Sequence, residues 1–600
     1  MVERVVASPL QGTVVHVEVE PGAVLRAGQP VVVVESMKME HLIAAEYAGL
    51  VIAIRVAAGD TVMPGDPVVV IDERAVLDED PPDGDPDAPA GEIRADLAEV
   101  IDRHAVGLDA ARPDAVARRR RSGQRTAREN IDDLCDPGSF TEYGPLVIAA
   151  QRRRRPVDDL IRKTPADGLV GGVGTVGGHP VVAMTYDYTV LAGTQGLQNH
   201  RKKDRLFDLA ERSRLPVVLF AEGGGGRPGD TDGIGVSGLG CMAFYLFARL
   251  SGLVPLVGIT SGRCFAGNAA LLGCCDVVIA TAGSNIGMGG PAMIEGGGLG
   301  IVTPEQVGPM GVQVPNGVVD VAVADEAEAV DVARRYLSYF QGRSETWSAP
   351  DQERLRDVIP ANRLRVYDVR HVIDGLADHG SILELRRAFA PGMVTALARV
   401  EGRAIGVVAN NPVHLAGAID AEGADKAARF MQLCDAFDVP VLFLCDTPGI
   451  MVGPAAEQTA LVRHVSRLFV TGANLTVPTF TIVLRKGYGL GAQAMAGGSF
   501  HAPFFTVAWP SGELGGMGLE GAVRLGYRNE LAASEDPDAL WAELVGRLYE
   551  QGRAVNAASF FELDDVIDPA DSRRWITMGL TSAPPPVPRA GKKRPNIDTW

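Results

Sequence analysis

The chain has 600 residues, of which 46% are hydrophobic and 22% charged, the composition of a globular protein with about three or four domains. Its formal net charge of −18 argues against general binding to nucleic acid or membrane surfaces, although local basic patches are still possible. We expect no secretory leader and no transmembrane segment, because no apolar run reaches the necessary length, and the seven cysteines form no zinc-ribbon pair. We therefore expect a cytoplasmic protein with reduced cysteines, no membrane partner, no nucleic-acid partner and no metal site.

The first 73 residues contain an internal repeat. Three glycines and a proline recur 37 positions later: Gly12, Gly22, Gly28 and Pro30 return as Gly49, Gly59, Gly65 and Pro67. The alternation of apolar residues recurs with them, and such alternation broken by Gly and Pro-Gly predicts short strands and tight turns. Two copies of this kind can pack face to face as a flattened barrel. Lys38 lies between the copies, where one strand turns into the next, so we expect it at an exposed hairpin tip.

The residues around Lys38 are typical of one family. In an arbitrary chain, a Met-Lys-Met triplet would mean a solvated lysine beside methionines that fill a nearby core. Here Glu35, Met37, Lys38 and Met39, with the glycines and the repeat, resemble the biotinyl (biotin carboxyl carrier) domain, in which a biotin protein ligase attaches biotin to the lysine. Lipoyl domains share the fold but lack the flanking methionines. Ser36 departs from the alanine that is usual in the family. The resemblance implies an all-β barrel-sandwich domain over 1–73, with biotin on Lys38.

Two segments of unusual charge follow this domain. Residues 74–91 are acidic and rich in Pro, Gly and Ala, which predicts a flexible linker that spans at most about 60 Å. Residues 92–134 show apolar positions at helical spacing and carry the basic run Arg118 to Arg121. A second basic run, "QRRRRP", covers residues 151–156. Each run is either a solvated face or a docking surface for an acidic partner or for the phosphates of a ligand.

From about residue 160 the chain repeats itself on a larger scale. "RLFDLAERSRLPVVLFAEGGG" matches "RFMQLCDAFDVPVLFLCDTPG", so that Pro216 and Pro440 lie 224 positions apart, as do Gly267 and Gly491. The apolar runs predict interior strands covered by helices. We predict two homologous α/β halves, residues 92–340 and 350–582, followed by a tail, 583–600, that is largely unstructured.

Each half carries a glycine-rich loop after a buried strand. "EGGGGRPGD" (222–230) is neither a P-loop nor a dinucleotide fingerprint, and "RKGYGLGAQ" (485–493) is its counterpart in the second half. A single loop of this kind is often only a tight turn. Two matched loops favour paired backbone N–H groups that stabilise an oxyanion.

Residues 120–580 resemble the carboxyltransferase subunit of biotin-dependent acyl-CoA carboxylases, a family with two crotonase-type halves. The motifs that carry this resemblance are "ARENIDDLCDPGSFTEYGPL" (127–146), "PADGLVGGVGTVGGHPVVAMTYDYTVLAGTQG" (165–196), "SGRCFAGNAALLGCCDVVI" (261–279), "DKAARFMQLCDAFDVPVLFLCDTPGIMVG" (425–453) and "RKGYGLGAQAM" (485–495).

The resemblance implies a mechanism that needs no side-chain base. Carboxybiotin releases CO2, the biotin nitrogen takes the α-proton of the acyl-CoA, and the thioester enolate attacks CO2. Two oxyanion holes hold the charge, and we assign the first to acyl-CoA and the second to biotin, although the assignment could be reversed. The residues implied are Gly224 and Gly225 for the first hole, Gly489, Leu490 and Gly491 for the second, and Arg227, Gly267, Gly290, Pro291 and Gln493 for the substrate pocket. Leu490 and the sequence "GGGGR", in place of Ser-Gly-Gly-Ala-Arg, depart from the family pattern.

No segment is long enough for an ATP-grasp module. The resemblance therefore implies a separate biotin carboxylase that uses ATP, Mg²⁺ and bicarbonate, and a homo-oligomer, typically a hexamer, with active sites at dimer interfaces. A subunit of a biotin-dependent decarboxylase or transcarboxylase is an alternative, and a non-catalytic biotin-carrying scaffold is another. The sequence names neither the acyl group nor the stoichiometry of the complex.

Overall fold

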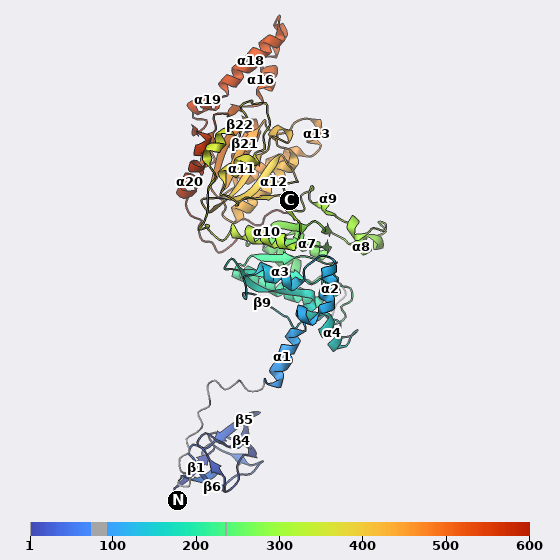
Figure 1. The fold of residues 1–600 in the computed structure, drawn as a ribbon, viewed down its shortest axis with the longest axis vertical. Coiled ribbons are helices and arrows are strands. Elements are labelled where there is room, and N and C mark those ends of the chain that lie inside the picture. The colour runs from blue at the N-terminus through green and yellow to red at the C-terminus, as the bar shows by residue number, and fades with distance from the viewer. Residues whose placement is uncertain (1, 74–92, 234–236) are drawn as a thin grey trace. The chain divides into compact units, whose positions relative to one another are not determined.

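The computed structural model describes residues 2–73, 93–233 and 237–600 and divides the chain into two compact units, residues 1–94 and 95–600 (Figure 1). The predicted linker, 74–91, lies outside the described residues. In the described part, no helix is long and apolar enough to cross a membrane. All seven cysteines are free, and five of them are buried.

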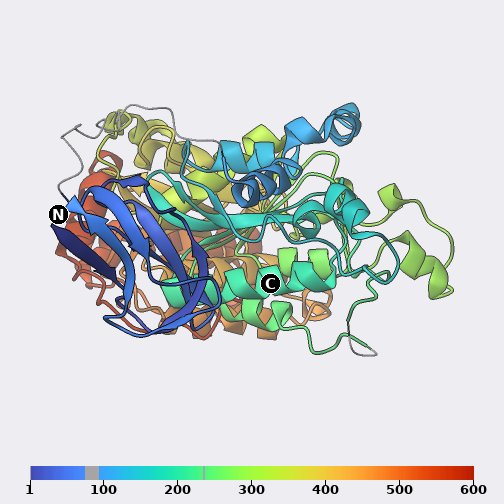
Figure 2. The ribbon, with the colours of Figure 1, turned by 90° about the horizontal axis from the view of Figure 1, so that it is seen from below.

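The N-terminal unit consists of two four-stranded antiparallel sheets, drawn in blue in Figure 2. One sheet contains β1 (Glu3–Ala7), β8 (Pro67–Asp72), β6 (Gly49–Ile54) and β3 (Val24–Leu25). The other contains β5 (Met39–Ala44), β4 (Pro30–Ser36), β2 (Gly12–Val17) and β7 (Thr61–Val62). Each sheet takes two long strands from one copy of the repeat and one short strand from the other. Valines of β4 and β8 are buried between the sheets, and this burial stabilises the small barrel.

The first half of the larger unit is built on a seven-stranded sheet. In spatial order its strands are β17 (Val321–Val323), β15 (Val277–Thr281), β13 (Leu256–Thr260), β12 (Val217–Phe220), β11 (His179–Tyr186), β10 (Leu169–Val176) and β9 (Thr141–Glu142). β9, β10 and β11 are antiparallel, and the strands from β11 to β17 are parallel. A separate two-stranded sheet contains β14 (Arg263–Phe265) and β16 (Asn285–Gly287).

The second half repeats this arrangement with eight strands. They are β18 (Leu383–Leu385), β19 (Met393–Val400), β20 (Arg403–Asn410), β21 (Val441–Thr447), β22 (Thr479–Tyr488), β23 (Phe505–Ala508) and β25 (Asp565–Val566), with β24 (Glu513–Gly515) paired to β22. β10, β11 and the start of β12 coincide with β19, β20 and the start of β21 after a shift of 224 positions. The two halves predicted from the sequence repeat are therefore present in the fold.

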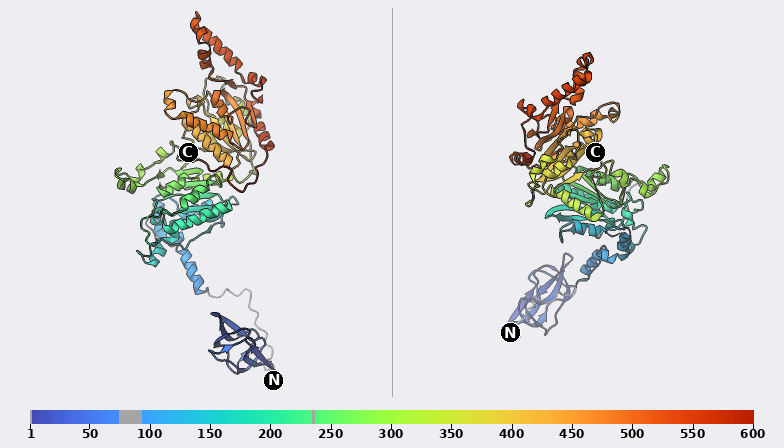
Figure 3. Two further views of the ribbon diagram at one scale, coloured as in Figure 1. Left: turned by 180° about the vertical axis from the view of Figure 1, so that it is seen from behind. Right: turned by 45° about the horizontal axis from the view of Figure 1, so that its top comes forward.

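Helices cover both sheets (Figure 3). The helices of the first half are α1 (Ala95–Ala105), α2 (Pro113–Arg121), α3 (Ala127–Leu134), α4 (Val157–Lys163), α5 (Leu197–Ser213), α6 (Ala243–Arg249), α7 (Gly267–Gly273), α8 (Pro291–Gly296), α9 (Met310–Gln313) and α10 (Glu326–Ser338). Those of the second half are α11 (Arg370–Leu376), α12 (Ala421–Ala436), α13 (Pro454–Glu457), α14 (Leu461–Ala473), α15 (Gly489–Ala494), α16 (Leu519–Gly526), α17 (Arg528–Ala533), α18 (Pro537–Gln551), α19 (Ala554–Ser559) and α20 (Ser572–Ser582). The predicted helical segment 92–134 corresponds to α1, α2 and α3.

One apolar core joins the two halves. It combines residues of α3 and α10, such as Leu134 and Leu337, with residues of α12 and α14, such as Leu433 and Leu468. Two further cores lie on the outer faces of the sheets, beneath α5 and α6 in the first half and beneath α11 and α20 in the second. The halves therefore form one compact unit, although they are separate repeats in sequence.

The tail, 583–600, contains no helix or strand, but both halves hold it in place. Ile597 is buried, and its N–H and C=O both bond to Ser251 Oγ of the first half. Arg594 forms an ion pair with Asp435 of the second half at 3.0 Å. The tail therefore links the two halves.

Candidate active site

Lys38 lies in the turn of the hairpin formed by β4 and β5. Ser36 pairs with Met39 across the strands, which leaves Met37 and Lys38 as the two loop residues, with φ of 53° and 66°. Positive φ at both loop positions is typical of a two-residue type I′ hairpin, which usually uses Asn or Gly there. Met37 is 94% exposed and Lys38 is also exposed. The predicted position of Lys38 at an exposed tip is confirmed, and its modification stays a prediction.

The hairpin presents negative charge beside Lys38. Glu35 lies directly opposite Glu40 in the strand register, and both side chains are exposed. Like charges at directly opposite positions destabilise a hairpin. A ligase or other partner that contacts this tip would meet two carboxylates next to the lysine.

The first glycine-rich loop follows β12 and lies beside β14. Gly223 donates to Arg263 O at 2.7 Å and accepts from Phe265 N at 2.9 Å. Gly225 has a φ of 86°, and a Cβ built on it would lie 2.6 Å from Ala266 Cβ, so only glycine fits at this close approach. The loop and the start of α7, at Gly267, are therefore in contact.

Asn268 fixes the first loop, and the sequence did not single it out. Its buried side-chain amide accepts from Gly225 N at 3.2 Å and donates to the carbonyls of Gly193 and Glu222. The N–H of Gly225 is therefore engaged. The N–H groups of Gly224, Gly226 and Gly267 have no acceptor among the hydrogen bonds of the described residues. In this structure Gly224 is the predicted donor whose N–H is free.

The side chain of Arg227 is buried and fixes the first loop. Its guanidinium forms an ion pair with Asp167, lies 3.5 Å from Asp230, and donates to Thr194 O at 2.8 Å. Burial raises the pKa of Asp167, and the charge of Arg227 opposes this shift. The side chain of Arg227 is only 4% exposed, so it is placed to hold the loop.

Gly267, Gly290 and Pro291 lie close to the first loop. A Cβ on Gly267 would lie 3.1 Å from the ring of Phe244, and one on Gly290 would lie 3.2 Å from the ring of Phe265. Phe265 is hydrogen-bonded to Gly223, and Pro291 is the first residue of α8. Three of the predicted pocket residues are thus brought to the same part of the first half.

The second glycine-rich loop has a matching geometry. α15 begins at Gly489, directly after β22, and its third residue, Gly491, packs on Gly449 in the loop after β21. A Cβ on Gly491 would lie 2.7 Å from Gly449 Cα. The N–H groups of Leu490 and Gly491 belong to the first turn of the helix and have no intrahelical acceptor. The side chain of Leu490, which departs from the family pattern, is 61% exposed.

Gln493 lines a cavity of about 490 Å³ beside this second loop. The cavity is also lined by Gly489, His501, Gln551 and Phe560. The structure therefore places Gln493 next to the second loop rather than the first.

Two titratable groups on α5 lie near the first loop. Burial lowers the pKa of His200 to about 4, so its imidazole is neutral at neutral pH, where it pairs with Cys241 Sγ at 3.0 Å. Burial also lowers the pKa of Lys203 to about 7, and its ammonium lies 2.9 Å from the Tyr186 hydroxyl. Among the described residues, no cluster of three or more His, Cys, Asp or Glu side chains could hold a metal ion.

Two family models match the chain. A carboxyl transferase domain matches residues 118–584, and a biotin-requiring enzyme domain matches residues 4–71. Together they include both glycine-rich loops and the hairpin of Lys38.

Similar proteins include carboxylases and a transcarboxylase. A solved single-chain, multi-domain long-chain acyl-CoA carboxylase is 58% identical, with a TM-score of 0.79 over 96% of this chain; the chain spans 56% of the length of that protein. The methylmalonyl-CoA carboxyltransferase 12S subunit of Propionibacterium freudenreichii subsp. shermanii is 36% identical over 78% of this chain and 90% of its own length. A crystal structure of a transcarboxylase 12S hexamer with methylmalonyl-CoA bound is 32% identical, with a TM-score of 0.73 over 83% of this chain and 98% of its own. These matches confirm the predicted fold class.

Proposed function

The chain belongs to the carboxyl transferase family and carries a biotin-requiring domain ahead of it, and from this premise we propose that Lys38 carries biotin and serves an acyl-CoA site in residues 95–600. The observation that carries the proposal is the combination of an exposed Met-Lys-Met hairpin with two matched glycine-rich loops in one chain. When bound, biotin supplies the carboxyl group and accepts the α-proton of the acyl-CoA.

The chain itself contributes backbone N–H groups that stabilise negative charge on the oxygen atoms of the thioester and of biotin. We assign Gly224 N–H to the thioester oxygen in the first half, and Leu490 N–H and Gly491 N–H to the biotin oxygen in the second. Asn268 and Arg227 act as positioning residues, because their side chains fix the first loop through contacts within the protein. Preorganised N–H donors of this kind are commonly the largest single contribution to catalysis.

We propose that the acyl group is a long chain, and that the reaction belongs to fatty acid metabolism in the cytoplasm. The support is the 58% identity to a long-chain acyl-CoA carboxylase. The panel to test contains acetyl-, propionyl-, octanoyl- and palmitoyl-CoA. A turnover that rises with chain length supports the proposal, and a preference for propionyl-CoA contradicts it.

The decisive experiment uses the biotinylated chain with a separate biotin carboxylase, ATP, Mg²⁺ and labelled bicarbonate. Label should reach the acyl-CoA only when both proteins are present. ATP-dependent carboxylation by the chain alone would show that it contains the carboxylase activity itself.

A second candidate function is transcarboxylation, which the 36% identity to a methylmalonyl-CoA carboxyltransferase subunit favours. A transcarboxylase would take the carboxyl group from another carboxylated metabolite. The two candidates are separated by whether a carboxylated metabolite other than an acyl-CoA can carboxylate the biotin on Lys38 without ATP.

We also propose that the active unit is an oligomer, a hexamer by analogy with the 12S structure. Light scattering on a preparation with full transferase activity should give a mass of several chains. A mass of one chain in that preparation would contradict the proposal.

A further inference from the structure

Residues 152–155 form an arginine loop whose backbone is fixed. The N–H groups of Arg152 and Arg153 donate to the two carboxylate oxygens of Asp232 at 3.0 and 3.2 Å. The N–H groups of Arg154 and Arg155 donate to Gln151 O at 2.9 and 3.0 Å. All four side chains are nevertheless exposed. The main chain is held, so the guanidinium groups project from a defined position.

The charge of this loop is largely uncompensated. Arg152 lies 3.7 Å from Asp232, but that carboxylate already accepts two backbone N–H groups. Arg154 donates to a neutral acceptor, Gly229 O, at 3.2 Å. In the part of the chain that the structure describes, neither Arg153 nor Arg155 has a side-chain ion pair or hydrogen bond. Four like charges in sequence repel one another, and this repulsion is relieved when an anion binds between them.

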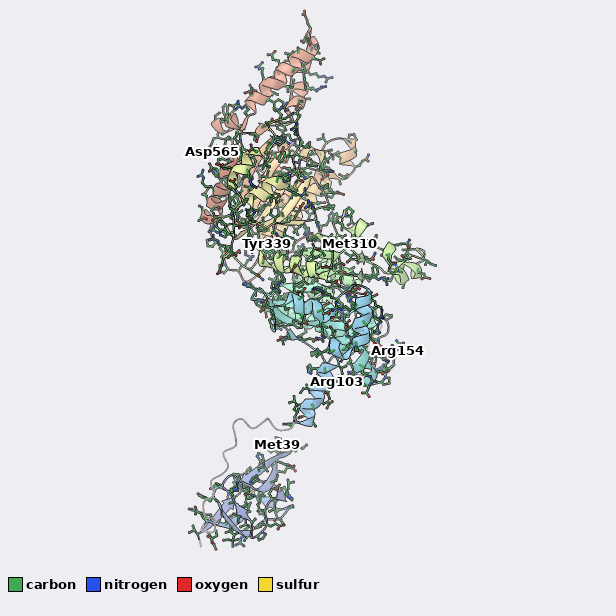
Figure 4. All side chains as sticks on the ribbon, viewed as in Figure 1. Met39, Arg103, Arg154, Met310, Tyr339 and Asp565 are labelled. Atoms are coloured by element: carbon green, nitrogen blue, oxygen red, sulfur yellow. The ribbon has the colours of Figure 1, made fainter. Side chains whose placement is uncertain are left out.

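The arginine loop is attached to the first glycine-rich loop. Gln151 Nε2 donates to Asp230 Oδ1 at 3.1 Å, and Asp230 in turn lies 3.5 Å from Arg227, the brace of the glycine loop. The N–H groups of Thr231 and Asp232 both donate to Ala150 O. Arg154, labelled in Figure 4, lies on the outer surface of the first half near α4. The positive loop and the candidate acyl-CoA site thus belong to one hydrogen-bonded unit.

We propose that this loop binds the phosphates of the CoA moiety, with Arg153 and Arg155 as the main contacts. The inference rests on the proposed function, since it takes the first half to hold acyl-CoA. CoA carries its 3′-phosphate and pyrophosphate at the end of the pantetheine arm, away from the thioester. A guanidinium group forms two parallel hydrogen bonds to phosphate, which makes arginine better suited to this task than lysine.

The test is calorimetric binding of three probes to the full biotinylated chain: CoA, 3′-dephospho-CoA and pantetheine. We compare the wild type with the double variant Arg153→Ala/Arg155→Ala. The double variant should bind CoA about tenfold more weakly, should lose most of the preference for CoA over 3′-dephospho-CoA, and should bind pantetheine as the wild type does. The loss for CoA should shrink at high salt.

The control is Arg162→Ala on α4. It removes an exposed arginine from the same region, but one that is already paired with Asp159 at 3.1 Å. If the double variant weakens CoA binding no more than this control does, or weakens pantetheine binding equally, the inference is wrong. If the wild type binds no CoA at all, the proposed function fails instead. The two failures are therefore distinguishable.

Discussion

Replacement of Gly491 by alanine tests the proposed second oxyanion hole most directly. The new Cβ would lie 2.7 Å from Gly449 Cα, whereas ordinary contact begins at 3.4 Å. The Cβ has no torsion that could move it away and Gly449 Cα is a backbone atom, so α15 and the loop after β21 must separate by about 0.7 Å. A displacement of about 1 Å in a catalytic constellation can cost a factor of 100 in rate. We therefore expect the transfer of label from carboxylated Lys38-biotin to acyl-CoA to slow by about 100-fold.

Two matched variants control for side-chain and folding effects. Leu490→Ala removes an exposed side chain but keeps its N–H, so it should change the rate little. Gly546→Ala introduces the same methyl group on α18, where nothing lies within 4 Å, and should be neutral. The reasoning is refuted if Gly491→Ala, with unchanged melting temperature and full biotinylation, transfers label within a factor of three of the wild type.

Three further predictions follow from residues outside the second loop. Lys38→Arg should abolish the single biotin seen in the intact mass of the protein, and a second biotinylated position would contradict the assignment. Asn268→Ala leaves Gly225 N–H and two buried carbonyls without a partner, so the urea midpoint should fall by the equivalent of about 2 kcal/mol and the KM for acyl-CoA should rise; unchanged values would remove Asn268 from its role. Because the pKa of Lys203 is about 7 when folded and near 10.5 when unfolded, the unfolded chain binds more protons between these values, and stability should rise with pH across this range. Lys203→Met should remove that part of the rise, and an unchanged difference curve would show that Lys203 is not buried as described.

The repeats made the fold predictable. The copies 37 positions apart placed Lys38 between two strands, and the copies 224 positions apart placed Gly267 and Gly491 at equivalent turns. In both cases the information is local, because strand alternation and glycine spacing are set by neighbouring residues. The N-terminal hairpin and the matched order of strands in the two larger sheets agree with the fold predicted from these repeats.

The contacts around the first loop could not be predicted in the same way. The sequence motif predicted Arg227 as a residue of the substrate pocket. Its guanidinium instead forms an ion pair with Asp167, which lies 60 positions away in sequence. The N–H of Gly225 is bound by Asn268, whose equivalent in the second half is Ala492, so the repeat itself gives no hint of this contact. Such contacts depend on how distant segments pack, and one sequence carries no information on that.

The core shared by the two halves has a consequence for synthesis of the protein. The faces of α3 and α10 are buried against α12 and α14, and Ile597 of the tail completes the same core. About 260 residues follow residue 340, and at about 5–20 residues per second a ribosome needs roughly 13–50 s to add them. During that time the first half exposes apolar surface, through which it can bind chaperones or aggregate. The N-terminal unit has a core of its own, so its Lys38 hairpin can fold, and become accessible to the proposed ligase, while the rest of the chain is still being translated.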